Sequence, residues 1–366
     1  MKIAIKREEI LYPLQHVIGA VERKQTLPIL GNVLIKSDQG RLTLTATDLE
    51  IELIAHIDLD FDVSLATTLP ARKLLDICKA LPDQAEIQFT IEDNQVTMTS
   101  GRSRFILASL PAKDFPATED IEPNLTLQVP QSVLKTLIEK TSFAMAQQDV
   151  RYYLNGLLVE VDPDKLRLVA TDGHRLALSE YEINTGVNAG RQLIMPRKGV
   201  LELARLLAHD EAPAVIKISN NHARIETDAI SFTTKLIDGK FPDYNRVIPL
   251  DGNKTMQVDR DLLKQALHRI SILSNEKYRG IRLNLEKDNL SIQANNPDRE
   301  EAQEEISVEY RETPLEIGFN VTYLLDVLAV IDNETVELRL KDSNSSCVVS
   351  NPGSEQYRYV IMPMRL

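Results

Sequence analysis

The stretch Leu166-Arg-Leu-Val-Ala-Thr-Asp-Gly-His-Arg-Leu176 carries the clearest structural signal in the chain. Its first half alternates apolar and polar residues, which is the period of a half-buried strand, and Asp172-Gly173 then predicts a turn. Two other segments repeat it, namely Leu42-Thr-Leu-Thr-Ala-Thr-Asp48 and Leu290-Ser-Ile-Gln-Ala-Asn-Asn296. The three segments begin at positions 42, 166 and 290, so each lies 124 residues from the next. This even spacing predicts a threefold repeat.

Each copy predicts two units that consist of a strand, an amphipathic helix and several further strands. The first helix of each copy has an apolar stripe at helical spacing, over residues 10–18, 133–138 and 262–270. In the latter half, Pro70–Ile77 matches Pro196–Leu203 and, more loosely, Asn320–Val327. Short connections favour antiparallel sheets. We predict an α+β chain of three similar domains, 1–124, 125–252 and 253–366, each with two helices and two antiparallel four-stranded sheets.

Length and composition indicate an ordinary globular protein. At 366 residues the chain exceeds the roughly 250–300 residues at which a single core divides, and 43% hydrophobic and 26% charged residues are typical of soluble domains. No apolar run approaches the roughly 20 residues needed to span a membrane, and the N-terminus does not have the pattern of a signal peptide. We therefore expect a cytoplasmic protein without a membrane partner. Cys78 and Cys347 form no CxxC pair, which predicts two small buried side chains.

No motif for catalysis or cofactor binding stands out. The sequence has no P-loop, Rossmann glycine pattern, HExxH or GxSxG, and its histidines do not pair at metal-ligand spacing. Asp172 and His174 could form the centre of an enzyme, although an Asp-Gly turn that ends a strand accounts for both. The acidic run at 298–305 lacks the spacing of a calcium loop. We predict no catalytic residue, no metal and no cofactor, with an enzyme centred on Asp172 and His174 as an alternative.

The net charge of −12 argues against nucleic acid as a partner, because DNA-binding proteins usually carry a basic surface. Basic residues nevertheless recur opposite the apolar stripes of four predicted helices. They are Arg72, Lys73, Lys79, Lys135, Lys140, Arg197, Lys198, Arg205, Lys264 and Arg269. This recurrence predicts a shared basic surface on a protein that is acidic elsewhere. A peptide-binding scaffold that never meets DNA is the second alternative.

Two segments have the properties of sheet edges that pair with another chain. Arg102 and Arg104 alternate with the apolar residues Phe105 and Leu107, whereas the run at 298–305 is rich in glutamate. Edge strands invite pairing, and opposite charges select which edge meets which. A head-to-tail contact of this kind closes into a ring when the rotation allows it.

Six short motifs are spread over the whole chain. They are Leu27-Pro-Ile-Leu-Gly-Asn32, Arg151-Tyr-Tyr-Leu-Asn-Gly156, Ala170-Thr-Asp-Gly-His-Arg-Leu176, Phe241-Pro-Asp-Tyr244, Ser274-Asn-Glu-Lys277 and Met362-Pro-Met-Arg-Leu366. Through them the chain resembles the bacterial sliding clamps, the beta subunits of DNA polymerase III. The resemblance implies the DNA clamp fold and a head-to-tail homodimeric ring through which duplex DNA threads. It also implies a non-catalytic processivity factor that acts in DNA replication and repair.

The resemblance further implies a pocket between the second and third domains that takes short linear peptides. Its expected partners are the DNA polymerase III alpha subunit, the delta subunit of the clamp loader, other polymerases and repair proteins. The matching positions are Leu154, Thr171, Gly173, His174, Arg175, Leu176, Pro242, Arg246, Val247, Asn320, Tyr323, Ser346, Val360, Met362, Met364, Arg365 and Leu366. Asn344 departs from the family, whose better-known members have an apolar residue there.

DNA contacts and the subunit interface are implied in the same way. The DNA-binding positions are Lys24, Arg72, Gln148, Tyr152, Tyr153, Lys198 and Arg246. Lys24 replaces an expected arginine and keeps the charge that a non-specific phosphate contact requires. The interface positions are Lys73, Arg102, Arg104, Phe105 and Leu107 on one chain, and Ile272, Leu273, Glu300, Glu301 and Glu304 on the other.

Overall fold

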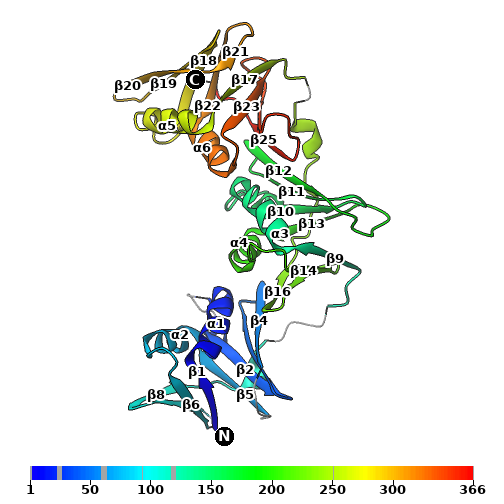
Figure 1. The fold of residues 1–366 in the computed structure, drawn as a ribbon, viewed down its shortest axis with the longest axis vertical. Coiled ribbons are helices and arrows are strands. Elements are labelled where there is room, and N and C mark those ends of the chain that lie inside the picture. Colours follow the sequence, from blue (N-terminus) through cyan, green and yellow to red (C-terminus); the bar gives the residue numbers. More distant parts are fainter. Residues whose placement is uncertain are drawn as a thin grey trace. The chain divides into compact units, whose positions relative to one another are not determined.

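The computed structural model describes residues 2–22, 27–58, 64–92, 94–116, 121–249 and 251–365. The chain divides into two compact units, whose helices and strands are labelled in Figure 1. The first consists of residues 1–134 and 201–236, and the second of residues 135–200 and 237–366. Two helices, α3 (Gln131–Glu139) and α4 (Arg197–Leu206), contribute residues to both units.

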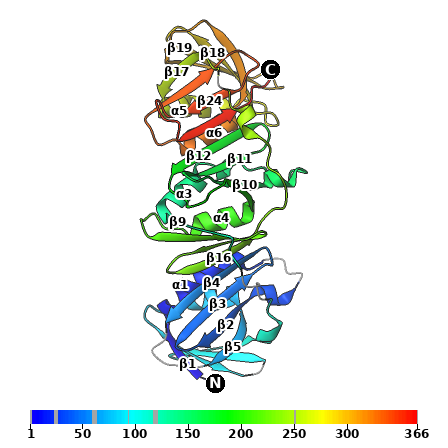
Figure 2. The same cartoon turned by 90° about the vertical axis from the view of Figure 1, so that its right-hand side faces the viewer.

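The first unit contains two antiparallel sheets. The smaller sheet has the strand order β1-β6-β7-β8, and the larger has the order β5-β2-β3-β4-β16-β15-β14-β9, part of which can be followed in Figure 2. Helix α1 (Arg7–Val17) packs on β3 and β4 and beside α2 (Ala71–Ala80). The strands are β1 (Lys2–Lys6), β2 (Asn32–Asp38), β3 (Arg41–Thr47), β4 (Ile51–Asp58), β5 (Leu65–Pro70), β6 (Glu86–Ile91), β7 (Gln95–Ser100), β8 (Ser103–Ala108), β9 (Leu125–Pro130), β14 (Pro213–Ile218), β15 (His222–Glu226) and β16 (Ile230–Lys235).

The second unit is built in the same way. Its larger sheet has the order β13-β10-β11-β12-β25-β24-β23-β17-β21, and its smaller sheet has the order β20-β19-β18-β22. Helix α5 (Arg260–Ser271) packs beside α6 (Val321–Val330). The strands are β10 (Gly156–Val161), β11 (Lys165–Thr171), β12 (Arg175–Glu182), β13 (Arg191–Pro196), β17 (Lys254–Asp259), β18 (Gly280–Glu286), β19 (Asn289–Asn295), β20 (Glu301–Ser307), β21 (Glu309–Tyr310), β22 (Leu315–Asn320), β23 (Thr335–Leu340), β24 (Cys347–Ser350) and β25 (Tyr357–Ile361).

The threefold repeat is confirmed. Strands β3, β11 and β19 begin at Arg41, Lys165 and Asn289, again 124 residues apart. In the described residues each copy contributes two helices and two sets of four neighbouring strands, and the third copy adds the two-residue strand β21. Neighbouring copies join edge to edge, because β4 pairs with β16 and β12 pairs with β25. The predicted α+β fold of three similar domains is therefore present, while the boundaries at 124 and 252 stay a prediction.

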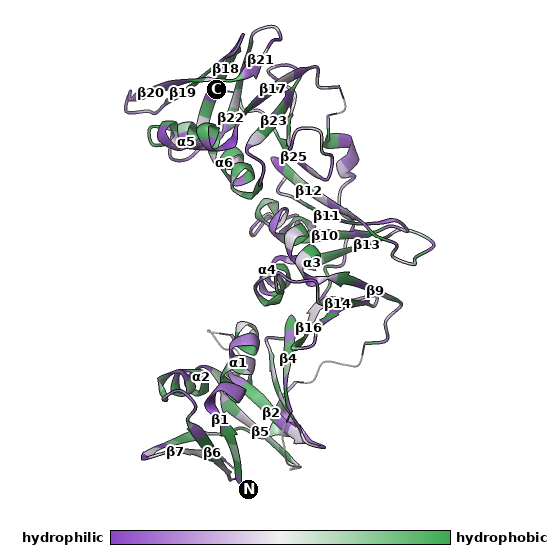
Figure 3. Ribbon diagram, viewed as in Figure 1, coloured by the Kyte–Doolittle hydropathy of each residue, from purple (hydrophilic) through white to green (hydrophobic). Residues whose placement is uncertain are grey.

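Burial follows the predicted stripes. In α1 the apolar residues Ile10, Leu11, Leu14 and Val17 are at most 7% exposed, and the helices carry hydrophobic and hydrophilic residues on different sides (Figure 3). Such an apolar stripe is what fixes an amphipathic helix on a sheet. None of the described helices is long and apolar enough to cross a membrane.

The turn after the repeated strand explains why the same letters recur. In the second copy, the Asp172 carboxylate accepts hydrogen bonds from the backbone N–H groups of His174 (2.8 Å) and Arg175 (3.0 Å). In the first copy, Asp48 accepts two equivalent bonds, at 2.9 and 2.8 Å. The residue after each aspartate has a positive φ, +89° at Gly173 and +76° at Leu49. The repeated Thr-Asp pair is thus a turn-forming element.

Candidate functional site

The second unit contains a cleft of about 500 Å³ that lies over the seam between the second and third copies. Its walls come from the turn before β12, from the segment at 242–249 with Asp251, from residues 344–346 and from the end of β25. The lining residues are Arg151, Leu154, Thr171, Gly173, His174, Arg175, Leu176, Pro242, Asp243, Tyr244, Arg246, Val247, Pro249, Asp251, Asn344, Ser345, Ser346, Val360 and Met362.

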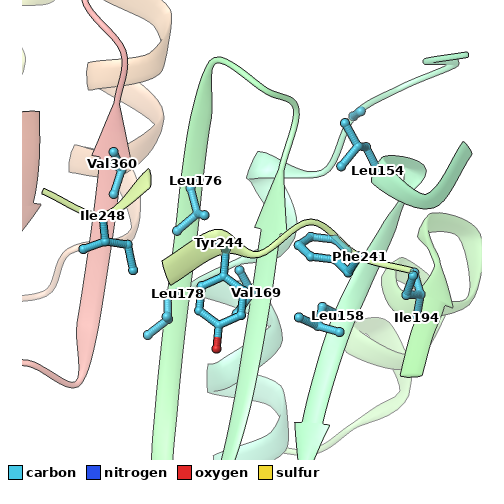
Figure 4. Close-up of a cluster of buried hydrophobic side chains, with 11 residues drawn as sticks. Leu154, Leu158, Val169, Leu176, Leu178, Ile194, Phe241, Tyr244, Ile248 and Val360 are labelled. Carbon is cyan, nitrogen blue, oxygen red and sulfur yellow. The ribbon is translucent and has the colours of Figure 1, made fainter. Parts of the chain in front are cut away.

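The floor of the cleft is apolar and well packed. Leu176 on β12 lies opposite Val360 on β25 in the strand register, Leu154 completes the floor, and the buried Tyr244 belongs to the adjoining wall (Figure 4). These side chains are at most 4% exposed. At the rim, in contrast, Val247 is 52% and Met362 is 48% exposed. Exposed apolar side chains around an apolar floor suit a ligand that buries hydrophobic side chains.

The backbone where the cleft meets Arg151 favours glycine. Gly173 has φ +89°, and a Cβ there would lie 3.0 Å from both terminal guanidinium nitrogens of Arg151. Arg151 donates to the Asp172 carbonyl (3.1 Å) and forms a two-point ion pair with Asp149. The hydrogen bonds from Arg151 lower the pKa of Asp149 to about 2. Arg151 is therefore a fixed cation at the rim, and it is absent from the set of residues expected from the sequence.

Arg175 lines the cleft, and its guanidinium is bonded within the protein. Its guanidinium pairs with Asp172 (3.1 Å) and Asp326, and it donates to the Phe143 carbonyl (2.8 Å). It also lies over the rings of Phe143 and Tyr323, at 5.3 and 4.6 Å from their centres. Only 11% of this side chain is exposed. Arg175 thus joins β12 to α6 beneath the cleft, and its charge is satisfied inside the protein.

A second polar cluster anchors the wall at 242–249. The Tyr244 hydroxyl, in the short helix Tyr244–Val247, donates to the Glu160 carboxylate (2.6 Å) and accepts from Arg167 (2.9 Å). Burial and the bond to Glu160 raise the pKa of Tyr244. Burial alone would raise the pKa of Glu160, but hydrogen bonds from Tyr244, Gln192 and Arg167 bring it below its usual value. The two hydrogen bonds of Tyr244 therefore fix this wall to β10 and β11.

The cleft unites twelve of the pocket residues expected from the sequence. They are Leu154, Thr171, Gly173, His174, Arg175, Leu176, Pro242, Arg246, Val247, Ser346, Val360 and Met362. Asn320, Tyr323, Met364 and Arg365 do not line it, and Leu366 lies outside the described residues. Asn320 instead caps α6 through the Thr322 N–H, and Met364 bonds to the Gly318 backbone. Asn344 is on the wall, which makes that side polar.

Sequence reasoning missed five lining residues besides Arg151. One is Ser345, and the other four are Asp243, Tyr244, Pro249 and Asp251. All four belong to the segment that crosses the cleft after β16. Asp243 and Tyr244 are part of the motif Phe241-Pro-Asp-Tyr244, which is the one sequence signal for this segment. Asp251 pairs with Lys341, whose hydrogen bond lowers the pKa of the carboxylate.

The residues expected to touch DNA are polar surface groups. Arg72, Gln148, Tyr152, Lys198 and Arg246 are exposed. Tyr153 is half-buried and packs edge-on against Tyr152, with 5.8 Å between ring centres. Lys24 lies outside the described residues.

The prediction that Lys140 belongs to a solvated basic surface is wrong. Lys140 is only 6% exposed, pairs with Asp332 and donates to the Val330 carbonyl. The reason is long-range, because the end of α6 covers this side of α3. The other basic helix residues are at least partly exposed, although Arg205 and Arg269 form ion pairs with Glu202 and Glu304.

The expected interface residues lie on or beside two sheet edges and one helix end. Arg104, Phe105 and Leu107 are on β8, which ends one sheet, and Glu301 and Glu304 are on β20, which ends another. Arg102 and Glu300 directly precede those strands, and Lys73 is on α2. Ile272 and Leu273 follow α5, and Ile272 is 70% exposed.

Nothing in the described residues indicates catalysis. No three His, Cys, Asp or Glu side chains among them come together as a metal site. Asp172, the centre of the enzyme alternative, uses its carboxylate to accept from two backbone N–H groups and from Arg175. These bonds give Asp172 a structural role in the turn. Cys78 and Cys347 are buried, as predicted, and burial raises the pKa of Cys78 to about 12.

Comparison with known proteins matches the chain along nearly all of its length. Residues 1–119, 128–243 and 245–365 match the N-terminal, central and C-terminal domains of the DNA polymerase III beta subunit. The beta sliding clamps of Pseudomonas putida and Pseudomonas aeruginosa are 53% and 52% identical, and each alignment covers 100% of both chains. A crystal structure of the Pseudomonas aeruginosa beta subunit superposes with a TM-score of 0.98 at 52% identity, again over 100% of both chains.

Proposed function

This chain belongs to the DNA polymerase III beta subunit family, and on that premise we propose that two copies close head to tail into a ring around duplex DNA. The chain is a DNA sliding clamp, a non-catalytic subunit that gives replication its processivity. A closed ring retains DNA by topology, so weak and sequence-independent phosphate contacts suffice. An overall charge of −12 is compatible with such contacts.

The observation that carries this proposal is the pair of sheet edges at β8 and β20. Within the chain, β4 of the first copy pairs with β16 of the second, and β12 of the second pairs with β25 of the third. By the repeat, β20 is the counterpart of β4 and β12, and β8 is the counterpart of β16 and β25. In the described residues, β8 and β20 each have a strand on one side only. A second copy would supply the missing neighbour of both.

The repeat also supplies a register for the contact between subunits. Ile51 pairs with Thr234 at the first seam, and Arg175 pairs with Ile361 at the second. The equivalent residues on β20 and β8 follow from their pairing with β19 and β7. With the same register between subunits, Arg104 lies opposite Gln303 of the partner subunit. Arg104 would then lie diagonally between Glu301 and Glu305 of the partner subunit. Opposite charges at such diagonal positions favour this edge pairing over others.

The cleft at the second seam is the proposed site for partner proteins. A short linear peptide would bury apolar side chains against Leu176 and Val360 and meet the polar groups of the rim. The proposed donors of such peptides are the DNA polymerase III alpha subunit, the clamp loader delta subunit, and other polymerases and repair proteins. Arg72, Gln148, Tyr152, Tyr153, Lys198 and Arg246 are the proposed DNA contacts, together with Lys24. We also place the protein in the cytoplasm.

A disulfide between subunits tests the ring and its register together. The double variant Arg104→Cys/Gln303→Cys places one thiol on each proposed edge, and directly opposed strand residues are close enough for a disulfide. The control, Arg104→Cys/Glu305→Cys, moves one thiol two residues along the strand. The native cysteines are buried and stay out of the reaction. We expect a covalent dimer from the first variant only.

The decisive measurement uses that locked dimer on DNA. The double variant is loaded by a clamp loader onto nicked circular plasmid, oxidised and isolated with the plasmid. We expect retention on the circle at high salt and loss after a single cut that linearises the DNA. Retention that survives cutting would mean direct gripping of DNA and would overturn the ring. A protein that never associates with DNA, yet binds peptide, would instead favour the scaffold alternative.

A further inference from the structure

Beside each seam between copies, the C-terminal ends of two helices meet, and we call this contact a joint. At the first joint, between the first and second copies, a cation lies between the two helix ends. Arg205, in the last turn of α4, donates to the carbonyls of His16 (2.7 Å) and Gln15 (3.2 Å), in the last turn of α1. Its guanidinium is held by Glu202 (3.0 Å). All of these residues belong to the first unit.

The second joint has the same arrangement with a different cation. Lys140, directly after α3, donates to the carbonyl of Val330, the last residue of α6, and pairs with Asp332. Helix C-terminal ends carry partial negative charge and unsatisfied carbonyl groups, so two ends side by side repel each other. A cation that bridges them offsets this repulsion and satisfies a carbonyl. Both internal joints therefore contain a bridging cation.

Counting residues from the start of each helix shows which equivalent positions carry the bridging cation. Helices α1, α3 and α5 begin at Arg7, Gln131 and Arg260, so their tenth positions are His16, Lys140 and Arg269. Helices α2, α4 and α6 begin at Ala71, Arg197 and Val321, so their ninth positions are Lys79, Arg205 and Ala329.

Each internal joint has one permanent cation at these two positions. Arg205 faces His16, whose pKa is lowered by burial and by Arg205, which favours the neutral imidazole. Lys140 belongs to the joint in which the other position is Ala329.

The helices left over are α5 and α2, whose ends carry Arg269 and Lys79. Arg269 is already paired within the chain, with Glu304 at 2.9 Å. Lys79 is exposed, and its ammonium has no ion pair or hydrogen bond with the described residues. The end of α2 is itself capped by Arg7, which donates to the Cys78 carbonyl (2.7 Å). Lys79 is therefore available to a helix of another chain.

A second position near the end of α5 also lacks a neighbour among the described residues of the single chain. The thirteenth positions counted from the starts of α1, α3 and α5 are Gly19, Phe143 and Ile272. Gly19 is so close to Glu202 that an added Cβ would lie 1.8 Å from its carboxylate oxygen. Phe143 is covered by Arg175 and by Tyr359, whose ring centre lies 5.9 Å away. Ile272 is 70% exposed, so it is the one of the three that lacks this cover in the single chain.

We propose that the end of α5 meets the end of α2 from a second copy, and that Lys79 of the partner subunit is the bridging cation. Its acceptors would be the carbonyls of His268 and Arg269, the counterparts of Gln15 and His16. The His268 carbonyl accepts from Ser271 Oγ (2.8 Å) and the Arg269 carbonyl from the Ile272 N–H (3.3 Å), and a carbonyl oxygen has two lone pairs with which it can accept a further donor. The bridge rests on the proposed head-to-tail dimer and adds a residue to it.

The test compares the monomer–dimer dissociation constant of Lys79→Met with that of wild type by mass photometry and sedimentation. The methionine keeps the length of the side chain and removes the charge. A ring contains two such joints, so we expect the constant to rise about tenfold at low salt and the difference to shrink as salt is added. Lys79→Arg should restore dimerisation, since arginine fills this role in the first joint. Lys36→Met, at an exposed lysine on β2, is the matched control.

The outcomes separate the bridge from the ring. If Lys79→Met dimerises like wild type and like Lys36→Met, while Ile272→Asp dissociates, the bridge is wrong and the head-to-tail dimer stands. If wild type itself stays monomeric at micromolar concentration, the head-to-tail dimer falls and the bridge falls with it. A loss that Lys79→Arg does not restore would also overturn the bridging role, because it would not depend on charge.

Discussion

Replacing Tyr244 with phenylalanine would test whether polar anchoring shapes the proposed peptide-binding cleft. The change removes only the hydroxyl, which donates to Glu160 at 2.6 Å and accepts from Arg167 at 2.9 Å. A hydrogen bond to a charged group contributes about 1.5–3 kcal/mol. Glu160 and Arg167 remain paired with each other after the change, so we expect the lower end, about 1.5 kcal/mol, as the loss in free energy of unfolding.

Part of that loss should appear as weaker peptide binding. Tyr244 belongs to the cleft wall, so a wall that is less firmly anchored spends less time in the binding-competent arrangement. Since 1.4 kcal/mol corresponds to tenfold in affinity, we expect a decrease of about three- to tenfold. The assay is fluorescence anisotropy with a labelled synthetic peptide that carries the clamp-binding segment of a DNA polymerase III alpha subunit.

The matched control is Tyr310→Phe. The Tyr310 hydroxyl also donates at 2.6 Å, to the Thr313 carbonyl, and this tyrosine is fully buried in the third copy away from the cleft. We expect Tyr310→Phe to destabilise folding and leave peptide affinity unchanged. Equal affinity in Tyr244→Phe and wild type would refute the reasoning, because apolar packing alone would then hold the wall. Equal loss of affinity in both variants would refute it as well.

Three further predictions concern single groups. Lys140→Met should lower the free energy of unfolding by about 1–2 kcal/mol in urea titrations, because Asp332 regains water while the Val330 carbonyl loses its donor. Arg151 lowers the pKa of Asp149 to about 2. The Arg151–Asp149 ion pair should therefore stabilise the fold fully at pH values above about 3.9, the pKa of an unfolded aspartate, and be lost as the pH falls towards 2. In Arg151→Gln, a carboxyl NMR titration should show a near-normal midpoint for Asp149. The Cys78 thiol, with a pKa raised to about 12 by burial, should resist a thiol reagent at pH 8 and react after unfolding; fast reaction in the native state would contradict its burial.

The sequence predicted the repeat because the information is local. Alternation along Leu166–Ala170 and its counterparts specifies a strand, and the Thr-Asp pair that follows specifies a turn, so an even spacing of 124 residues was enough to count the copies. The cleft was less accessible to such reasoning. Its apolar floor comes from two strands that are distant in the chain, and only the family resemblance brought Leu176 and Val360 together before the structure did.

The charged residues show where sequence reasoning fails. Lys140 has the spacing of a solvent-facing lysine on α3, yet the end of α6, some 190 residues later, buries it. Arg175 lines the cleft as expected from the sequence, but the sequence does not show that its guanidinium also pairs with Asp326 and donates to the Phe143 carbonyl. In both cases an acidic partner, Asp332 for Lys140 and Asp326 for Arg175, belongs to the next copy of the repeat. The helix spacing that predicts one face of a helix contains no information about which neighbour covers the other face.

The joints between copies suggest why the backbone repeats more faithfully than the side chains. The seams β4–β16 and β12–β25 have the same register, which backbone hydrogen bonds fix without reference to side-chain identity. Once the strands of a seam are paired, the helix ends beside it come together whatever residues they carry. The partial negative charges of two C-terminal ends therefore repel each other at every joint. One cation on either helix solves that problem, so Arg205 serves on α4 at one joint and Lys140 after α3 at the next. Every joint should therefore carry a cation at one of these two positions. The proposed α5–α2 joint has both, Arg269 from one chain and Lys79 from the other.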